Sequence, residues 1–210
     1  MKALLSHTPG GPETLTVEEL PDPVAGPGQL LVRVRAAAIN YPDVLIIEDR
    51  YQFKPPRPFA PGGEIAGEVE AVGEGVLGWA VGDRLIAVPG WGGLVEKIVI
   101  DAKTAFRLPD DRSFTDGAAL LLTYATSIHA LYDRGDLKVG ETLLVLGAAG
   151  GVGLAAVELG KARGARVIAA VSSEEKAEAA RKAGADEAIV YPRGPFDKDG
   201  SKALATMFKE

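Results

Sequence analysis

The second half of the chain alternates short apolar runs with longer segments whose apolar residues recur at helical spacing. Leu143 to Leu146 form a continuous apolar run of the kind seen in buried parallel strands, and Arg166 to Val171 form another. Between them, a segment from Val152 to Arg163 has helical spacing and is ended by Gly164. Its expected buried stripe comprises Val152, Ala155, Ala156, Leu159 and Ala162. This order predicts a βαβ unit, because strand, helix and strand follow within about thirty residues.

A further strand is expected from Ala188 to Tyr191, and a last apolar stretch lies near Ala203 to Phe208. Three parallel strands make up only the first half of a doubly wound sheet. The edge at the first of these strands is therefore expected to lie open.

The first half of the chain shows shorter runs of alternating or β-rich residues, separated by glycine and proline. The runs expected to form strands are Leu31 to Arg35, Glu68 to Val72, Asp83 to Val88 and Leu94 to Ile100. Short strands joined by such turns are typical of a compact β domain, here a partly closed barrel. From Thr115 to Leu131 the spacing becomes helical, which predicts one helix connecting the β domain to the βαβ unit.

Composition narrows the classes of protein that remain. The chain has 210 residues, a net charge of −6 and no cysteine. The negative charge argues against nucleic acid or an anionic membrane as the main partner, and the lack of cysteine excludes disulfides and thiolate metal sites. The longest uncharged apolar stretch, Thr142 to Val157, is too short to span a membrane. We therefore expect a cytoplasmic protein that acts on a small molecule.

Three glycines follow the first strand of the βαβ unit with the spacing GxxGxxG. Glycine permits a tight turn and close backbone approach, and the N-terminus of the following helix offers N–H groups and partial positive charge to phosphates. The pattern therefore predicts a dinucleotide site, with a purely structural loop as the alternative. The residues expected to bind the cofactor here are Gly147, Ala148, Ala149, Gly150, Gly151, Val152 and Gly153.

The end of the second strand bears on the choice between NADP and NAD. Ser172, Ser173 and Lys176 offer hydroxyl groups and a positive charge, which suit a 2′-phosphate. Glu174 leaves NAD open, because an acidic residue in this region can bind the ribose hydroxyls. Ser172 and Glu175 also match a capping box for a helix from Glu174 to Ala183, and both roles of the serine can hold together.

Several motifs together resemble the zinc-free quinone oxidoreductases, or zeta-crystallin-like proteins, of the medium-chain dehydrogenase/reductase superfamily. They are the Met-Lys-Ala opening, Asn40-Tyr-Pro-Asp43, Pro61-Gly-Gly-Glu-Ile-Ala-Gly67, Val81-Gly-Asp-Arg84, Thr123-Tyr-Ala-Thr126, the glycine loop, and Ala183-Gly-Ala-Asp186 to Tyr191. The resemblance implies a GroES-like β-barrel domain (residues 1–124) followed by the first half of a Rossmann sheet (residues 125–210). It also implies NADPH as the cofactor and a homodimer for the full-length protein. Members of the family continue for about another half of this length.

The resemblance also assigns individual residues. Asn40, Asp43 and Tyr51 resemble the polar wall of the family's substrate cleft, and Thr126 resembles a contact near the nicotinamide. Ser172, Lys176 and Tyr191 resemble its 2′-phosphate pocket. Structural roles stand beside the cleft assignments: Asn40 as a turn cap, Asp43 as the N-terminal charge of a short helix, and Tyr51 as packing.

Zinc alcohol dehydrogenases share this fold, and their pattern places a cysteine near the position of Asn40 and a histidine in a Gly-His-Glu motif. This chain has Gly62-Gly63-Glu64 there, and its two histidines are His7 and His129. We expect no metal site. Together these observations predict an NADPH-dependent quinone reductase that uses no metal. The alternatives are a reductase of activated alkenes, such as enones or enoyl thioesters, and a nucleotide-binding fragment without catalysis.

Overall fold

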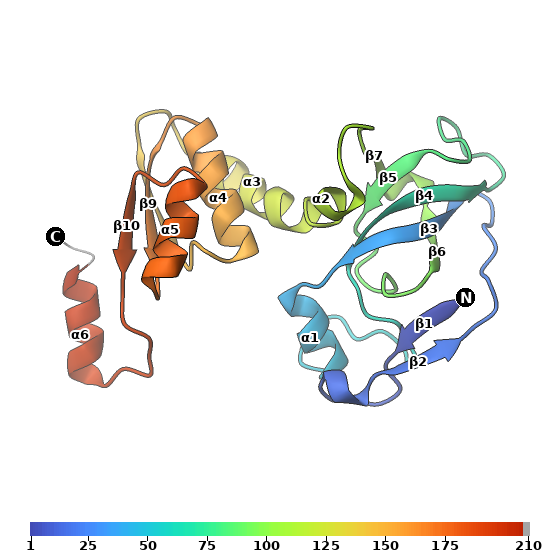
Figure 1. Cartoon of the computed structure of the whole chain (residues 1–210), viewed down its shortest axis with the longest axis horizontal. Helices are drawn as coiled ribbons and strands as arrows, with labels where there is room; N and C mark the ends of the chain where they lie inside the picture. Colours follow the sequence, from blue (N-terminus) through green and yellow to red (C-terminus); the bar gives the residue numbers. More distant parts are fainter. Residues whose placement is uncertain (208–210) are drawn as a thin grey trace. The chain divides into compact units, whose positions relative to one another are not determined.

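The chain folds into two compact units, residues 1–122 and residues 123–210 (Figure 1). A computed structural model describes residues 1–207. Phe208, the last residue of the apolar stretch expected near the C-terminus, lies outside this described range. Each unit is described by itself below.

The first unit is built on antiparallel sheets. β1 (Lys2–Leu5) pairs with β2 (Thr16–Glu19), and a larger sheet has the strand order β6-β3-β4-β5-β7. The strands of the larger sheet are β3 (Gln29–Ala38), β4 (Glu64–Val72), β5 (Arg84–Ala87), β6 (Lys97–Asp101) and β7 (Ala105–Arg107). The second edge of β1 bonds to the segment just before β6, through Leu4 N to Leu94 O at 3.0 Å. All four runs expected to form strands thus contribute to the larger sheet.

Period-two alternation explains where the core of this unit lies. Leu30 and Val32 on β3, Ile65 and Val69 on β4 and Leu85 on β5 are almost completely buried in one cluster. Each such side chain stabilises the fold by about 1.5–3 kcal/mol relative to an exposed position. Short helices join the strands: η1 (Pro12–Thr14), α1 (Tyr41–Ile47), η2 (Ala102–Thr104) and α2 (Phe114–Ala118).

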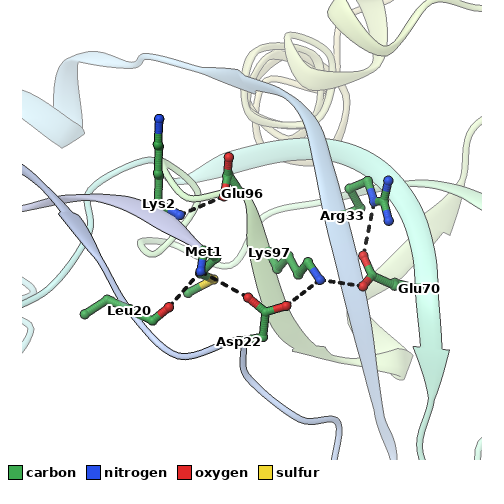
Figure 2. A network of polar contacts seen from close by, with 8 residues as sticks. All are labelled: Met1, Lys2, Leu20, Asp22, Arg33, Glu70, Glu96 and Lys97. Carbon is green, nitrogen blue, oxygen red and sulfur yellow. Dashed lines mark hydrogen bonds and ion pairs between the residues drawn. The ribbon is translucent and has the colours of Figure 1, made fainter.

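A network of charges fastens the start of β1 to the larger sheet (Figure 2). The terminal amine of Met1 lies 3.1 Å from Asp22, and Lys97 Nζ lies 2.5 Å from Asp22 and 2.6 Å from Glu70. Arg33 Nε, on β3, lies 3.1 Å from the same Glu70 on β4. Hydrogen bonds from Lys97 hold the pKa of both carboxyl groups below their usual values. Since Asp22 and Glu70 each pair with two cations, the network couples five segments in a way that a single surface pair does not.

The second unit is a parallel three-stranded sheet with the order β10-β9-β8. Its strands are β8 (Thr142–Leu146), β9 (Arg166–Val171) and β10 (Glu187–Val190). The crossover helix α4 (Gly151–Ala162) packs on β8 and β9, and α5 (Glu174–Lys182) packs on β9 and β10. In the described part of the chain β8 pairs with β9 alone, so its other edge is open as expected. α6 (Lys198–Met207) follows β10 (Figure 1).

The buried stripe of α4 differs from the one that apolar spacing predicts. The buried residues are Ala155, Val157 and Gly160, whereas Val152 is 45% exposed. A Cβ atom at Gly160 would lie 2.7 Å from Leu143 and 2.9 Å from Val167, so α4 approaches the sheet through a residue without a side chain. A hydrophobic pattern does not mark glycine as a buried position, so the predicted stripe is rotated about the helix axis relative to the observed one.

The single helix expected from Thr115 to Leu131 is also wrong in detail. α2 ends at Ala118, and wider π-helical turns, η3 (Leu121–Ala125) and η4 (His129–Arg134), flank the short α3 (Thr126–Ile128). A continuous helix would direct the N–H groups of residues 121 and 122 to carbonyl groups four residues earlier. Here both N–H groups donate instead to the carboxylate of Glu64, with Leu122 N at 3.0 Å from Oε1. The helix therefore stops where this buried carboxylate takes its donors. The boundary expected after Tyr124 lies inside η3.

Candidate functional site

The glycine loop joins β8 to α4, and each of the three glycines of the GxxGxxG spacing has a different local environment. Gly147 has φ of +66°, a left-handed conformation that favours glycine. A Cβ at Gly153 would lie 2.5 Å from the carbonyl oxygen of Gly147 and 2.8 Å from the Cα of Ala148. A Cβ at Gly150 would meet only the same oxygen, at 3.6 Å, which is an ordinary contact. The fold of the loop therefore requires glycine at 147 and 153 but not at 150.

A cavity of about 180 Å³ opens beside this loop, at the carboxyl ends of the parallel strands. Gly150 is the N-cap of α4, so the first N–H groups of a twelve-residue helix lie next to the cavity. The lining comprises Gly147, Ala149, Gly150, Val171, Ser172, Lys176 and Tyr191. The cavity thus brings together residues of the loop and residues following β9 and β10, which are separated in sequence. Ala148 is fully buried beneath it, and Gly151, Val152 and Gly153 form the first turn of α4.

The two serines after β9 have different roles from those expected of a capping box. Ser173, rather than Ser172, is the N-cap of α5 and accepts from Lys176 N at 3.4 Å. Ser172 remains at the end of the strand, where its Oγ accepts from Lys176 Nζ at 3.3 Å and from Arg193 Nε at 3.3 Å. Because Ser173 takes the N-cap position, the hydroxyl of Ser172 is left to the cavity. Arg193 is not among the site residues predicted from the sequence.

A second, larger cavity of about 410 Å³ lies within the first unit. Its wall is mainly apolar and aromatic, and its polar groups include the side chains of Asn40 and Asp43 and the phenol of Tyr51. The lining comprises Asn40, Pro42, Asp43, Ile46, Tyr51, Phe53, Gly63, Val88, Gly90, Trp91 and Leu122. The three residues expected in a substrate cleft, Asn40, Asp43 and Tyr51, therefore share one cavity. Phe53 and Trp91, which were not expected, add aromatic surface suited to a flat apolar molecule.

Asp43 is 5% exposed and both of its carboxylate oxygens accept from backbone N–H groups. Oδ2 lies 2.7 Å from Asn40 N at the start of α1, and Oδ1 lies 3.1 Å from Gly62 N. These bonds match the helix-terminal role considered for Asp43 beside its cleft role. They fix the backbone on both sides of the cavity, since Asn40 and Gly62 come from segments flanking α1 and β4.

Glu64 is fully buried at the start of β4 and holds the side chain of Asn40. Asn40 Nδ2 donates to Glu64 Oε2 at 3.3 Å, while Oε1 accepts from Leu122 N. Burial raises the pKa of Glu64 above its usual value, and the nearby Asp43 adds to the increase, although the hydrogen bonds oppose it. The amide of Asn40 is thereby oriented with one N–H on Glu64. Its second N–H remains for a molecule in the cavity.

Three comparisons bear on this arrangement. Residues 26–110 match the family model of the alcohol dehydrogenase GroES-like domain, and residues 151–210 match that of the zinc-binding dehydrogenases. Quinone oxidoreductase-like protein 2 of Mus musculus is 37% identical over 194 residues, which are 92% of this chain and 55% of the mouse protein. The chain thus spans about half the length of the curated relatives it matches.

Two solved oxidoreductase structures are also similar to this chain over most of its length. The quinone oxidoreductase of Thermus thermophilus, described also in complex with NADPH, has a TM-score of 0.82 and 36% identity, covering 91% of this chain and 60% of that one. An NAD-dependent alcohol dehydrogenase has a TM-score of 0.86 and 32% identity, covering 100% of this chain and 68% of that one. The chain belongs to the medium-chain dehydrogenase/reductase superfamily. The GroES-like and Rossmann-type units expected from the sequence are confirmed for this superfamily member.

One of the two matching family models is that of the zinc-binding dehydrogenases, a name that implies residues able to bind zinc. Among residues 1–207 there is no group of three or more His, Asp or Glu side chains placed to hold a metal ion, and the whole sequence lacks cysteine. His7 Nε2 lies 2.6 Å from Glu18, and His129, on the exposed face of its helix, lies 3.0 Å from Asp133. The described residues do not fit a catalytic zinc ion.

The helical run before β8 supports the glycine loop of this superfamily member. Ser127 is buried and its hydroxyl donates to Val152 O at 3.0 Å, in the first turn of α4. The Tyr124 hydroxyl donates to Glu158 on α4, and this bond raises the pKa of Tyr124 to about 12. Thr126, expected near the nicotinamide, is exposed on α3 and lines neither cavity.

In the described chain no helix is long and apolar enough to cross a membrane.

Proposed function

We propose that this chain carries the cofactor site and the substrate cavity of an NADPH-dependent oxidoreductase that reduces quinones without a metal ion. The observation that carries the proposal is that the chain contains both a polar cavity beside the glycine loop, lined by Ser172 and Lys176, and an apolar aromatic cavity that includes Asn40. Relatives named as quinone oxidoreductases support the substrate class.

The residues present fit a dinucleotide phosphate. Gly150 has space beside it that the fold of the loop does not use, and the N-terminus of α4 supplies donors for a pyrophosphate. Lys176 and Ser172 offer charge and hydrogen bonds for a 2′-phosphate. Glu174, which left NAD open, is bonded to Arg181 at 2.7 Å along α5 and does not line the cavity. These contacts favour NADP over NAD.

The bound cofactor supplies the hydride for the reduction. The protein's part is to hold the quinone ring against the apolar wall and to polarise a carbonyl oxygen. The second N–H of Asn40 is the donor proposed for that oxygen, with its orientation set by Glu64. Tyr51 brings a phenol to the same cavity as a second polar group, and Asp43 acts as a positioning residue through the backbone. A quinone needs little polarisation, because hydride transfer and one proton convert it into an aromatic hydroquinone.

The proposal is tested by following NADPH oxidation with 1,4-benzoquinone and with 2-cyclohexen-1-one, each with and without EDTA and against a blank without protein. We expect quinone reduction that EDTA does not change. Asn40→Leu should lower kcat by about tenfold to a hundredfold through loss of one donor, whereas Gln52→Leu, an exposed amide outside the cavity lining, should not. Turnover of the enone alone, or loss of activity in EDTA that zinc restores, would contradict the proposal. NADPH binding without any turnover would assign the chain a binding role only.

A further inference from the structure

The hydroxyl of Ser172 receives hydrogen bonds from two cations that come from different elements. Lys176 lies in the first turn of α5, and Arg193 follows β10. Lys176 Nζ and Arg193 Nε each lie 3.3 Å from Ser172 Oγ. The parallel pairing of β9 and β10 explains the convergence, since the carboxyl ends of both strands meet at one edge of the sheet.

The acidic side chains of α5 and of the start of β10 do not pair with these two cations. Glu174 pairs with Arg181, while Asp186 and Glu187, at the opposite end of β10 from Arg193, pair with Lys161 and Arg166. Glu175 is exposed and does not line the cavity. In the described part of the chain neither Lys176 nor Arg193 has a carboxylate within ion-pair distance. Two positive charges therefore share one neutral acceptor, which is unfavourable until an anion arrives.

The hydrogen-bond inventory shows what kind of anion fits. A hydroxyl oxygen has two lone pairs and one proton, so an oxygen that accepts from both cations still has its O–H to donate. Lys176 keeps two further N–H donors and the guanidinium of Arg193 keeps four. Convergent donors with a charge of two suit a phosphate monoester, which carries about −1.5 to −2 at pH 7.

We propose that Arg193 is a second cation that binds the 2′-phosphate of NADPH together with Lys176, and that it is a determinant of NADPH selectivity. The inference rests on the proposed function and adds to it a residue outside the cavity lining. Arg193 is exposed and reaches the site through Ser172. Its planar guanidinium can form two parallel bonds to phosphate oxygens, a geometry that the ammonium of Lys176 does not provide.

The test compares 2′,5′-ADP with 5′-AMP by titration calorimetry, because the two ligands differ only in the 2′-phosphate. The proteins are the unsubstituted chain, Arg193→Gln, Arg193→Lys and Lys182→Gln. Arg193→Gln should weaken 2′,5′-ADP binding about tenfold, the usual effect of one hydrogen bond to a charged group, and leave 5′-AMP binding unchanged. Arg193→Lys should retain part of the preference. Lys182→Gln removes the same charge from α5 at a residue that pairs with Glu178 instead, and should change neither affinity.

The outcomes separate this inference from the proposed function. If the unsubstituted chain prefers 2′,5′-ADP and Arg193→Gln keeps the whole preference, the role of Arg193 is overturned and NADPH selectivity stands on Lys176. If the unsubstituted chain shows no preference, both the inference and the NADPH assignment fall. The preference should also shrink as NaCl is raised, with a smaller salt dependence in Arg193→Gln. Equal salt dependence in the two proteins would count against a charge contact at residue 193.

Discussion

Replacement of Gly150 by alanine should separate cofactor binding from folding. At this position φ is −81° and ψ is 165°, which alanine adopts readily, and the added Cβ meets only one carbonyl oxygen at 3.6 Å. Alanine restricts the unfolded chain, which stabilises by about 0.4–1 kcal/mol. It is also a poorer N-cap than glycine, by about 0.5–1 kcal/mol. The two effects offset each other, so the free energy of unfolding should change by no more than about 0.5 kcal/mol.

The effect on the cofactor should be much larger. The new methyl group occupies the surface by which the pyrophosphate approaches the N-terminus of α4. Loss of one hydrogen bond to a charged phosphate costs about 1.5–3 kcal/mol, which corresponds to an affinity at least tenfold lower. The assay is NADPH titration by calorimetry or fluorescence, together with thermal and denaturant unfolding of the same samples.

Gly153→Ala is the matched control. Its Cβ would lie 2.5 Å from the oxygen of Gly147, where the backbone cannot move without distorting the loop. The substitution should therefore destabilise the fold by about 1–3 kcal/mol. The reasoning is refuted if Gly150→Ala binds NADPH like the unsubstituted chain. It is also refuted if Gly150→Ala loses as much stability as Gly153→Ala, because the glycine would then serve the fold.

Three further changes probe the first unit. Asp43→Ala leaves two largely buried N–H groups without their acceptor and should lower the free energy of unfolding in denaturant by about 3 kcal/mol. The exposed control Asp116→Ala should lower it by about 0.5 kcal/mol or less. Equal losses in the two variants would refute the role of Asp43. Burial raises the pKa of Glu64 above its usual value of 4.5, so the folded state binds this proton more tightly than the unfolded state does. The contribution of Glu64 to stability therefore falls as the pH rises from 4.5 through the raised pKa. Glu64→Gln should remove that part of the dependence of Tm on pH, and an unchanged slope would contradict the assignment. Trp91→Ala should raise the KM for apolar quinones about tenfold through lost aromatic contact while NADPH affinity stays constant; an unchanged KM would place the quinone elsewhere.

Much of the fold could be predicted because its signals are local. The runs at Leu143 to Leu146 and Arg166 to Val171 correspond closely to β8 and β9, since strands of parallel sheets read as continuous apolar runs. The glycine loop was located because its GxxGxxG spacing between a strand and a helix is also a local pattern. The stripe of α4 was not, because close approach through Gly160 depends on the neighbouring sheet rather than on hydrophobicity.

The features that sequence reasoning missed depend on contacts between distant segments. Glu64 interrupts the helical run at Leu121 although 58 residues separate it from Leu122, and no local pattern shows that pairing. Ser172 was expected to cap α5, but the choice between two adjacent serines depends on where β9 ends. Arg193 was within reach of sequence reasoning. It follows β10 as Ser172 follows β9, and the residues after neighbouring parallel strands meet at one edge of the sheet.

The most direct test of the central claim is the ratio of kcat/KM for NADPH to that for NADH, measured with 1,4-benzoquinone as the acceptor. The contacts at Ser172 and Lys176 predict a ratio well above ten, since a 2′-phosphate gains at least one charge-assisted hydrogen bond there. A ratio near or below one, or no reduction of the quinone with either cofactor, would contradict the account.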